Sequence, residues 1–459
     1  MNAKNSIVSR VELCVGIDIG TTTISAMVYD LESKKQLKAY TIPHSSYLKS
    51  GDFSEQSVSV IMDSAENLLY EIIDTYDGIV SIGITGQMHG IVYVDKDGSA
   101  VSNLINWQDK RADLVLDNGK STCELICDIT GEHISAGYGI ATHYYNMLNA
   151  LVPNDASGLC TIMDLLAMKI CGIKKSITHT SVGASLGLFD LQKNCFKTDK
   201  LHLLGIDESI LPIITPKSAI IGECRGIPVC VPIGDNQASF LGSIGENSDT
   251  VLVNAGTGSQ ISVACDDFTI VDRELELRPL IEGKYLICGS ALCGGYAYAM
   301  LEKFFRSYML SATNEEKSQY SIINKLAAKA YEEGEVPLIV DSCFCGKRSN
   351  PDLRGSIREI GRENFTPSAL ALGFLCGMCN ELYELYERLP SKKARVVASG
   401  GTIKKNEVLR ILIANRFGTT VQLNNVEEES ATGVALFSAL AIQKITYNNG
   451  FAEYISYNK

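Results

Sequence analysis

The sequence lacks the features that direct a chain to a membrane or to nucleic acid. No apolar run in its 459 residues approaches the ~20 residues that a membrane span needs. Residues 1–10 are polar and lack the apolar region of a secretory signal. Basic residues are few, with 41 Lys and Arg against 53 Asp and Glu and a net charge of −12. We therefore expect no membrane partner and no nucleic-acid partner, because both need a basic surface.

A disulfide pattern is also missing. The 15 cysteines are odd in number and scattered, several of them inside apolar runs, so a reducing cytoplasm is the expected setting. One group has an alternative interpretation as a zinc site, and its members are Cys343, Cys345, Cys376 and Cys379. The first pair has a single intervening residue and the second falls within an expected helix at residues 368–385, which favours cysteines buried in the core.

Long linkers and low-complexity segments are absent, and strand-like segments alternate with helix-like ones. Residues 55–76 carry apolar side chains at helical spacing and precede a short apolar strand at residues 79–84, the rhythm of an α/β protein. The chain is longer than one core usually supports. We therefore predict two domains, residues 1–242 and residues 243–459.

Two short segments resemble each other at a spacing of about half the chain. In each, an apolar strand runs into a glycine-containing turn and back into a second strand. The turns are Asp18-Ile19-Gly20-Thr21-Thr22-Thr23 and Asn254-Ala255-Gly256-Thr257-Gly258-Ser259. Such hairpins point backbone N–H groups and hydroxyls at one spot, which suits a phosphate. Either turn alone has an ordinary structural explanation, but the pair predicts a duplicated domain that clamps nucleotide phosphates between its halves.

Two polar loops of the first half suit a hydroxyl-rich ligand. Gln87, Met88 and His89 follow the strand at residues 79–84, where ligands of open α/β sheets tend to bind. Trp107 is the only tryptophan, and Gln108 and Asp109 follow it. A sugar stacks its C–H face on such a ring while its hydroxyls take the polar groups. The plainer alternatives are a satisfied loop histidine and a surface turn anchored by tryptophan.

Asp235 is the sharpest candidate for a catalytic base. It ends an apolar strand beside Gly234 and precedes Asn236, where a carboxylate can take the proton of a hydroxyl that attacks a phosphoryl group. The alternative is a helix N-cap. Later, the strand at residues 396–399 meets Gly400 and Gly401, a turn on which a flat base can lie.

In this order the segments resemble the FGGY family of carbohydrate kinases, from about Val15 to Ala441. The resemblance implies an α/β, two-domain actin-like ATPase (ribonuclease H-like) fold of duplicated domains with an interdomain cleft. It implies ATP and Mg²⁺ as cofactors, Asp18 holding Mg²⁺ through water and Asp235 as the base. The implied nucleotide contacts are Gly20, Thr21, Thr22, Thr23, Gly256, Thr257, Gly258, Gly294, Gly295, Gly400, Gly401 and Asn406. The implied sugar contacts are Gln87, Met88, His89, Trp107, Asp109, Asp235 and Asn236.

Within the family, the sugar motifs resemble those of xylulokinases and sedoheptulokinases. Gln108 is similar to the sedoheptulokinases, as are residues 137–142 and 161–164, whereas Lys110 and the segment 180–185 depart from the usual pattern. We therefore expect a kinase that makes sedoheptulose 7-phosphate, with a xylulokinase or other pentulose kinase as the alternative. Relatives often form dimers, so a homodimer is among the expected states. A sugar-sensing regulator with this fold is the non-enzyme alternative.

Overall fold

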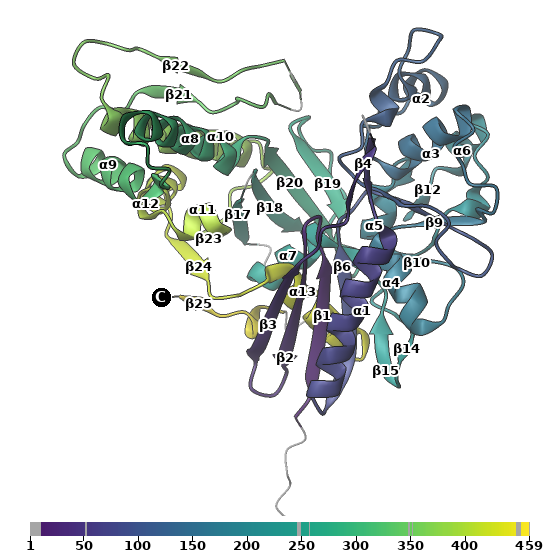
Figure 1. Ribbon diagram of the computed structural model, residues 1–459. Coiled ribbons are helices and arrows are strands. Elements are labelled where there is room, and N and C mark those ends of the chain that lie inside the picture. Colours follow the sequence, from purple (N-terminus) through teal and green to yellow (C-terminus); the bar gives the residue numbers. More distant parts are fainter. Residues whose placement is uncertain are drawn as a thin grey trace, which may run out of the picture. The chain divides into compact units, whose positions relative to one another are not determined.

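The computed structural model describes residues 11–50, 53–245, 249–256, 258–347, 349–350, 352–446 and 451–458. The chain forms two compact units (Figure 1). Unit 1 comprises residues 1–246, 278–284 and 426–455, and unit 2 comprises residues 247–277, 285–425 and 456–459. The sequence predicts a single boundary after residue 242. The structure differs in returning residues 426–455 to unit 1, because the helix in that segment packs on the first sheet.

Unit 1 is built on a sheet with the strand order β14-β15-β6-β1-β2-β3, and β16 also pairs with β6. The bounds are β1 Leu13–Ile19, β2 Thr23–Asp30, β3 Lys35–Pro43, β6 Ile79–Gly86, β14 Ile220–Cys224, β15 Ile227–Cys230 and β16 Ile233–Gly234. β1 and β2 form the predicted first hairpin, with Asp18 opposite Ser25. β6 lies parallel to β1 on its other side.

Side-chain alternation along β1 separates the two faces of this sheet. Leu13, Val15, Ile17 and Ile19 are buried in one core cluster with the apolar side of α1 (Val58–Thr75), which Ser57 caps, and with α4 (Ile162–Cys171). The opposite face carries Gly16, where an added Cβ would lie 1.9 Å from the carbonyl oxygen of Ala431. Helix α13 (Glu429–Ala441) therefore lies directly against the backbone of β1.

The remaining elements of unit 1 are short helices and small sheets that surround the polar loops. The helices are α2 Thr122–Thr130, α3 Gly139–Leu148, α5 Thr180–Ser185, α6 Thr198–Leu203 and α7 Asp235–Ile244. The strands are β4 Tyr47–Ser50, β5 Phe53–Gln56, β7 Val92–Val94, β8 Leu104–Ile105, β9 Gly158–Cys160, β10 Ile177–His179, β11 Phe189–Asp190, β12 Cys195–Phe196 and β13 Ile213–Thr215. Single 3₁₀ turns are η1 Arg111–Asp113, η2 Glu208–Ile210 and η4 Phe451–Tyr454.

Unit 2 repeats the strand plan of unit 1. Its sheet has the order β19-β20-β18-β17-β23-β24-β25, with β17 Thr250–Ala255, β18 Ser259–Cys265, β19 Leu275–Pro279, β20 Tyr285–Ala291, β23 Arg395–Ser399, β24 Val421–Asn424 and β25 Tyr457–Asn458. β17 pairs antiparallel with β18 and parallel with β23, as β1 does with β2 and β6. The predicted second hairpin and the predicted α/β fold of duplicated halves are confirmed.

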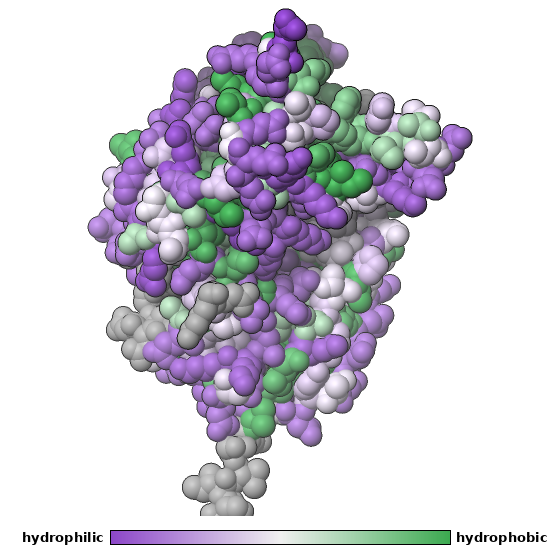
Figure 2. Space-filling model, turned by 90° about the vertical axis from the view of Figure 1, so that its left-hand side faces the viewer, coloured by the Kyte–Doolittle hydropathy of each residue, from purple (hydrophilic) through white to green (hydrophobic). Residues whose placement is uncertain are grey.

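In the described part of unit 2, five helices accompany this second sheet, together with the small β21–β22 ribbon. They are α8 Gly294–Thr313, α9 Tyr320–Glu332, α10 Pro367–Glu387, α11 Gly401–Lys404 and α12 Glu407–Phe417, and the ribbon strands are β21 Ile339–Asp341 and β22 Ser356–Arg358. On the face drawn in Figure 2, hydrophobic residues lie in small groups among hydrophilic ones. Within the described part of the chain, no helix is both long and apolar enough to cross a membrane.

The contact between α7 and α13 depends on two glycines. An added Cβ at Gly433 would lie 1.8 Å from the carbonyl oxygen of Ala238, and one at Gly242 would lie 1.9 Å from that of Glu429. Real side chains do not tolerate such distances, so the two helices approach backbone to backbone. Residues 235 and 429, which begin these helices, are thereby held in one place.

Substituting Gly433→Ala is expected to lower the free energy of unfolding by about 1–3 kcal/mol or more, because the methyl group forces α13 away from α7. The measurement is the urea midpoint of the first unfolding transition. Gly361→Ala is the matched control, since its Cβ would meet its nearest neighbour, Asn364 Oδ1, only at 3.6 Å. Equal midpoints for the two variants would contradict the close contact.

Candidate active site

The turn of the first hairpin is held from behind by two buried side chains. His44 Nε2 lies 3.1 Å from the carbonyl oxygen of Gly20, and Gln56 Nε2 donates to the carbonyl oxygen of Thr21 at 2.9 Å. These two contacts fix the backbone of Gly20 and Thr21 in the predicted phosphate turn. The hydroxyl of Thr21 accepts a hydrogen bond from Trp107 Nε1 at 3.1 Å. Thr21 therefore joins the phosphate turn to the predicted sugar loop.

Asp18, near the end of β1, is a half-buried carboxyl group whose pKa is strongly perturbed. Its Oδ1 atom is buried and accepts no hydrogen bond from the described residues. Burial, with smaller contributions from the negative charges of Asp235 and Glu428, raises the pKa of Asp18 from 3.8 to about 8. A cation near Asp18 would relieve this repulsion, so its orphaned oxygen fits the predicted role toward Mg²⁺.

The donor set around Asp18 favours an indirect contact with a metal. Among the described residues, no three His, Cys, Asp or Glu side chains converge in a geometry that would hold an ion directly. Magnesium commonly keeps several waters and takes few protein ligands beside substrate phosphates. Contact through water therefore remains the prediction for Asp18. The same finding leaves the zinc alternative for the described cysteines without a cluster, and all of them are free thiols.

Asp235 is the first residue of α7, directly after β16. Gly234 holds the N-cap position and no side chain caps the helix, so the alternative that Asp235 is the cap does not hold. The Asp235 Oδ1 atom accepts from its neighbour Asn236 twice, from the backbone N–H at 2.7 Å and from Nδ2 at 3.0 Å. Burial raises the pKa of Asp235, and the Asn236 hydrogen bonds and the charge of Arg278 partly oppose that rise. A carboxylate with a raised pKa can accept a proton near neutral pH.

The loop after β6 is packed tightly against the Asp235 turn. Gln87 Nε2 donates to Gln56 Oε1 at 3.1 Å, and an added Cβ at Gly234 would lie 2.6 Å from Met88 Sδ. His89 adopts a positive φ of 70°, which is uncommon for a residue with a side chain and marks a constrained position. The structure therefore places Met88 against Gly234, the residue before Asp235, and Gln87 against Gln56.

Helix α5 positions both the histidine and the aspartate turn. His89 Nδ1 donates to the carbonyl oxygen of Ser185 at 2.7 Å, which makes Nε2 the acceptor nitrogen of the neutral ring. The backbone N–H of Gly234 donates to Ser181 Oγ at 3.1 Å. The ring of Tyr138 lies 4.4 Å from the His89 ring, centroid to centroid.

The Trp107 loop is held by a buried ion pair. Both carboxylate oxygens of Asp109 bind the guanidinium of Arg111, Nε at 2.8 Å and Nη2 at 3.1 Å, and Oδ2 also accepts from the Ser54 N–H. Asp109 is fully buried, whereas Trp107 is 46% exposed. The contacts of Asp109 thus hold the loop, and direct binding of the sugar by its carboxylate stays a prediction.

The segment after α2 contacts the Trp107 loop at Gly137. It has a φ of 84°, and an added Cβ would lie 2.1 Å from the carbonyl oxygen of Trp107. The chain therefore passes directly over the Trp107 backbone before Tyr138 reaches His89. Two separate parts of the predicted sugar site are joined in this way.

The residues that hold these loops together carry no motif in the sequence. Gln56 is fully buried and connects Thr21, Gln87 and Asn106 through its single amide, whose contact with Asn106 is 3.4 Å long. The roles of His44 behind Gly20 and of Arg111 beside Asp109 were not predicted either. Each lies in a polar stretch of sequence that matches no motif. Their burial, which the fold reveals, is the only sign of their role.

In unit 2, a cavity of about 720 Å³ lies beside the second hairpin. Its lining includes four predicted nucleotide contacts, namely Gly256, Gly295, Gly401 and Asn406. Gly295 packs on the hairpin so closely that an added Cβ would lie 2.0 Å from the carbonyl oxygen of Gly256, and Gly294 packs similarly on Ser259. Gly400 has a φ of 86° and lies against Ala255. Thr257 lies outside the described residues, and Gly258 accepts from the Gly256 N–H at 3.0 Å.

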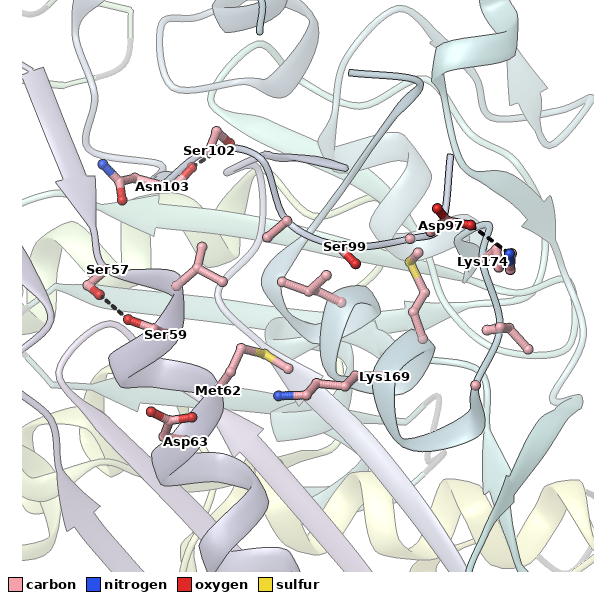
Figure 3. A pocket seen from close by; sticks show the side chains of 17 residues that line it. Ser57, Ser59, Met62, Asp63, Asp97, Ser99, Ser102, Asn103, Lys169 and Lys174 are labelled. Atoms are coloured by element: carbon pink, nitrogen blue, oxygen red, sulfur yellow. Dashed lines mark hydrogen bonds and ion pairs between the residues drawn. The ribbon is translucent and has the colours of Figure 1, made fainter. Parts of the chain in front are cut away.

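A second cavity, of about 660 Å³ in unit 1, contains none of the predicted site residues. Figure 3 shows Ser57 and Ser59 at the start of α1, with Lys169 and Lys174 approaching from α4 and the segment after it. Both lysines are paired, Lys174 with Asp97 at 2.7 Å and Lys169 with Glu66 at 2.5 Å. Two of the charged groups in the lining, Lys169 and Lys174, are therefore already engaged by carboxylates.

Comparison with known proteins assigns both halves of the chain. Residues 13–242 match the N-terminal domain of the FGGY family of carbohydrate kinases, and residues 252–442 match its C-terminal domain. Mouse and human sedoheptulokinases are 25% and 24% identical, over 92% of this chain and 96% of theirs. A xylulose kinase of Staphylococcus xylosus is 23% identical, over 97% and 94%.

Solved structures share the fold at lower identity. A gluconate kinase and a ligand-bound xylulose kinase, both from Lactobacillus acidophilus, have TM-scores of 0.82 at 20% and 19% identity. Each alignment covers 98% of this chain and 93% of the other. The predicted two-domain actin-like ATPase fold is thereby confirmed.

Replacing Asp18 by Asn should stabilise the nucleotide-free protein, increasingly so at higher pH. The folded-state pKa of Asp18 is raised from 3.8 to about 8, so the wild type loses stability as pH rises between these values. Asparagine has no charge to bury. The measurement is the melting temperature from pH 5 to 9, with Asp199→Asn, whose side chain is 76% exposed, as the control. A constant difference across this range would contradict the buried charge.

Proposed function

The chain belongs to the FGGY family of carbohydrate kinases, and on that premise we propose that it phosphorylates sedoheptulose with Mg-ATP, giving sedoheptulose 7-phosphate. The family makes it an ATP-dependent carbohydrate kinase. The particular ketose is the proposal. It is supported by mouse and human sedoheptulokinases, each matched over 92% of this chain.

Asp235 is the proposed general base. The terminal hydroxyl of the open-chain ketose attacks the γ-phosphorus of ATP while its proton passes to the Asp235 carboxylate, and ADP leaves. Asn236 orients that carboxylate by donating twice to Oδ1. This half-buried, oriented carboxylate beside the Gln87–His89 loop is the observation that carries the proposal.

Phosphate charge is proposed to be met by the two hairpins and by Mg²⁺. When bound, the metal would neutralise phosphate oxygens, and Asp18 would hold it through water. Gly20, Thr22 and Thr23 would offer backbone N–H groups and hydroxyls from a turn that His44 and Gln56 fix. Gly256 and Gly258 would do the same from the second hairpin, with Gly294 and Gly295 at the start of α8.

The sugar is proposed to lie against the loops that Gln56 and α5 hold together. Trp107 would offer its exposed face to the sugar C–H groups, while Met88, His89 and Asn236 would contact hydroxyls and the chain between them. Gln108, at the edge of this loop, accepts a hydrogen bond from the Tyr47 hydroxyl at 2.7 Å. Gln108 is the position whose residue type favours a heptulose.

The substrate is tested by a coupled ADP-release assay with sedoheptulose, D-xylulose, D-ribulose, L-ribulose and glycerol. The expected result is the highest kcat/KM with sedoheptulose. A preference for D-xylulose would overturn the substrate but keep the reaction, an outcome in line with the similarity to the Staphylococcus xylosus enzyme. Turnover with none of them would favour a sugar outside the panel or a sugar-sensing regulator.

Asp235→Asn is expected to lower kcat by about 10²–10⁴-fold, because the amide cannot accept the proton. Its ADP affinity should change little, since the nucleotide is proposed to bind unit 2. Isothermal calorimetry and the coupled assay measure the two quantities, with Asp199→Asn as the control. Retention of most of the turnover would rule out Asp235 as the base.

A further inference from the structure

A short chain of hydrogen bonds beneath the unit 2 cavity orients one amide toward it. The backbone N–H of Leu409 in α12 donates to Asn406 Oδ1 at 3.0 Å. A backbone N–H can only donate, so this contact identifies the oxygen of the Asn406 amide. The other end of the Asn406 amide must then be its NH₂ group.

The same logic continues to Asn324 on α9. Asn406 Nδ2 donates to Asn324 Oδ1 at 3.0 Å, and the Tyr298 hydroxyl donates to that oxygen at 2.6 Å. Both acceptor sites of the Asn324 oxygen are then in use. The orientation of this amide is set by two donors, one of which is itself set by the backbone of α12.

The NH₂ group of Asn324 is consequently the end that remains for a ligand. Within the described part of the chain it makes no hydrogen bond, and Asn324 lines the cavity together with Tyr296, Tyr320 and Thr402. Gly401, on the floor of the cavity, is a predicted nucleotide contact that leaves its backbone open to a flat ring, with no atom within 4 Å of where a Cβ would stand. The cavity therefore offers a fixed hydrogen-bond donor beside a surface for a planar base.

We propose that Asn324 is a specificity-determining residue for the nucleotide base, and that its NH₂ group donates to a ring nitrogen of adenine. This inference rests on the proposed binding of ATP in unit 2. Adenine offers ring acceptors at N1, N3 and N7, whereas its exocyclic amine is a donor that cannot pair with an NH₂ group. Asn406 acts as a positioning residue, because it holds Asn324 in the donating orientation.

The test is equilibrium binding of ADP and of 1-deaza-, 3-deaza- and 7-deaza-ADP to the full chain, by isothermal calorimetry. In each analogue a C–H group replaces one ring nitrogen. The wild type is expected to bind one of the three about 3–10-fold more weakly than ADP, the effect of one lost hydrogen bond. Equal binding of ADP and all three analogues would overturn the assignment of Asn324 and leave the kinase proposal standing.

Variants separate this contact from a general effect on the fold. Asn324→Asp keeps an oxygen for Tyr298 and Asn406 but presents no donor, so its affinity for ADP should fall and the preference for ADP over the critical analogue should disappear. A preference that survives in Asn324→Asp would assign the contact to another group. Failure of the wild type to bind ADP at all would instead contradict the proposed kinase function.

A second pair of variants tests the positioning role. In Asn406→Asp the carboxylate still accepts from Leu409, but its other oxygen faces Asn324 and turns that amide around, so the analogue preference should be lost although Asn324 is unchanged. Tyr298→Phe leaves Asn406 in place and should retain the preference for ADP over the critical analogue. A uniform loss of affinity for ADP and the analogues in Asn406→Asp, with the preference intact, would contradict the positioning role.

Discussion

The backbone contact between α7 and α13 governs the layout of unit 1. Gly242 and Gly433 let the two helices meet without intervening side chains, and Gly16 lets α13 lie on β1. Asp235 and Glu428 therefore begin their helices close enough to Asp18 for their charges to raise its pKa. Three carboxylates distant in sequence thus lie within electrostatic reach of one another at the first hairpin, an arrangement that destabilises the ionised form of Asp18.

The polar loops of unit 1 are held in place largely by a buried amide and a buried imidazole, those of Gln56 and His44. Gln56 connects the phosphate turn to Gln87 and Asn106, and His44 supports Gly20. On the other side, Ser181 and Ser185 of α5 support Gly234 and His89. Gln56 and α5 each hold two of these loops in a fixed arrangement.

In unit 2 the same principle acts on the nucleotide side. Asn406 has two roles, because one end of its amide caps α12 and the other orients Asn324. The sequence motif singled out Asn406 as a nucleotide contact, yet its cap and its neighbour engage both ends of the amide. In the proposed arrangement the base is recognised by Asn324, a residue that belongs to no sequence motif.

The sequence by itself determined the two hairpins, the repeated α/β plan and the family, because turn chemistry and strand periodicity are local properties. It also singled out Asp18, Asp235 and four of the residues that line the unit 2 cavity. Only the tertiary structure decided that Gly234 and not Asp235 occupies the cap position of α7, that Arg111 engages the Asp109 carboxylate, and that residues 426–455 return to unit 1. Those outcomes depend on contacts between residues that are distant in sequence, and the spacing of residues along the chain does not specify such contacts.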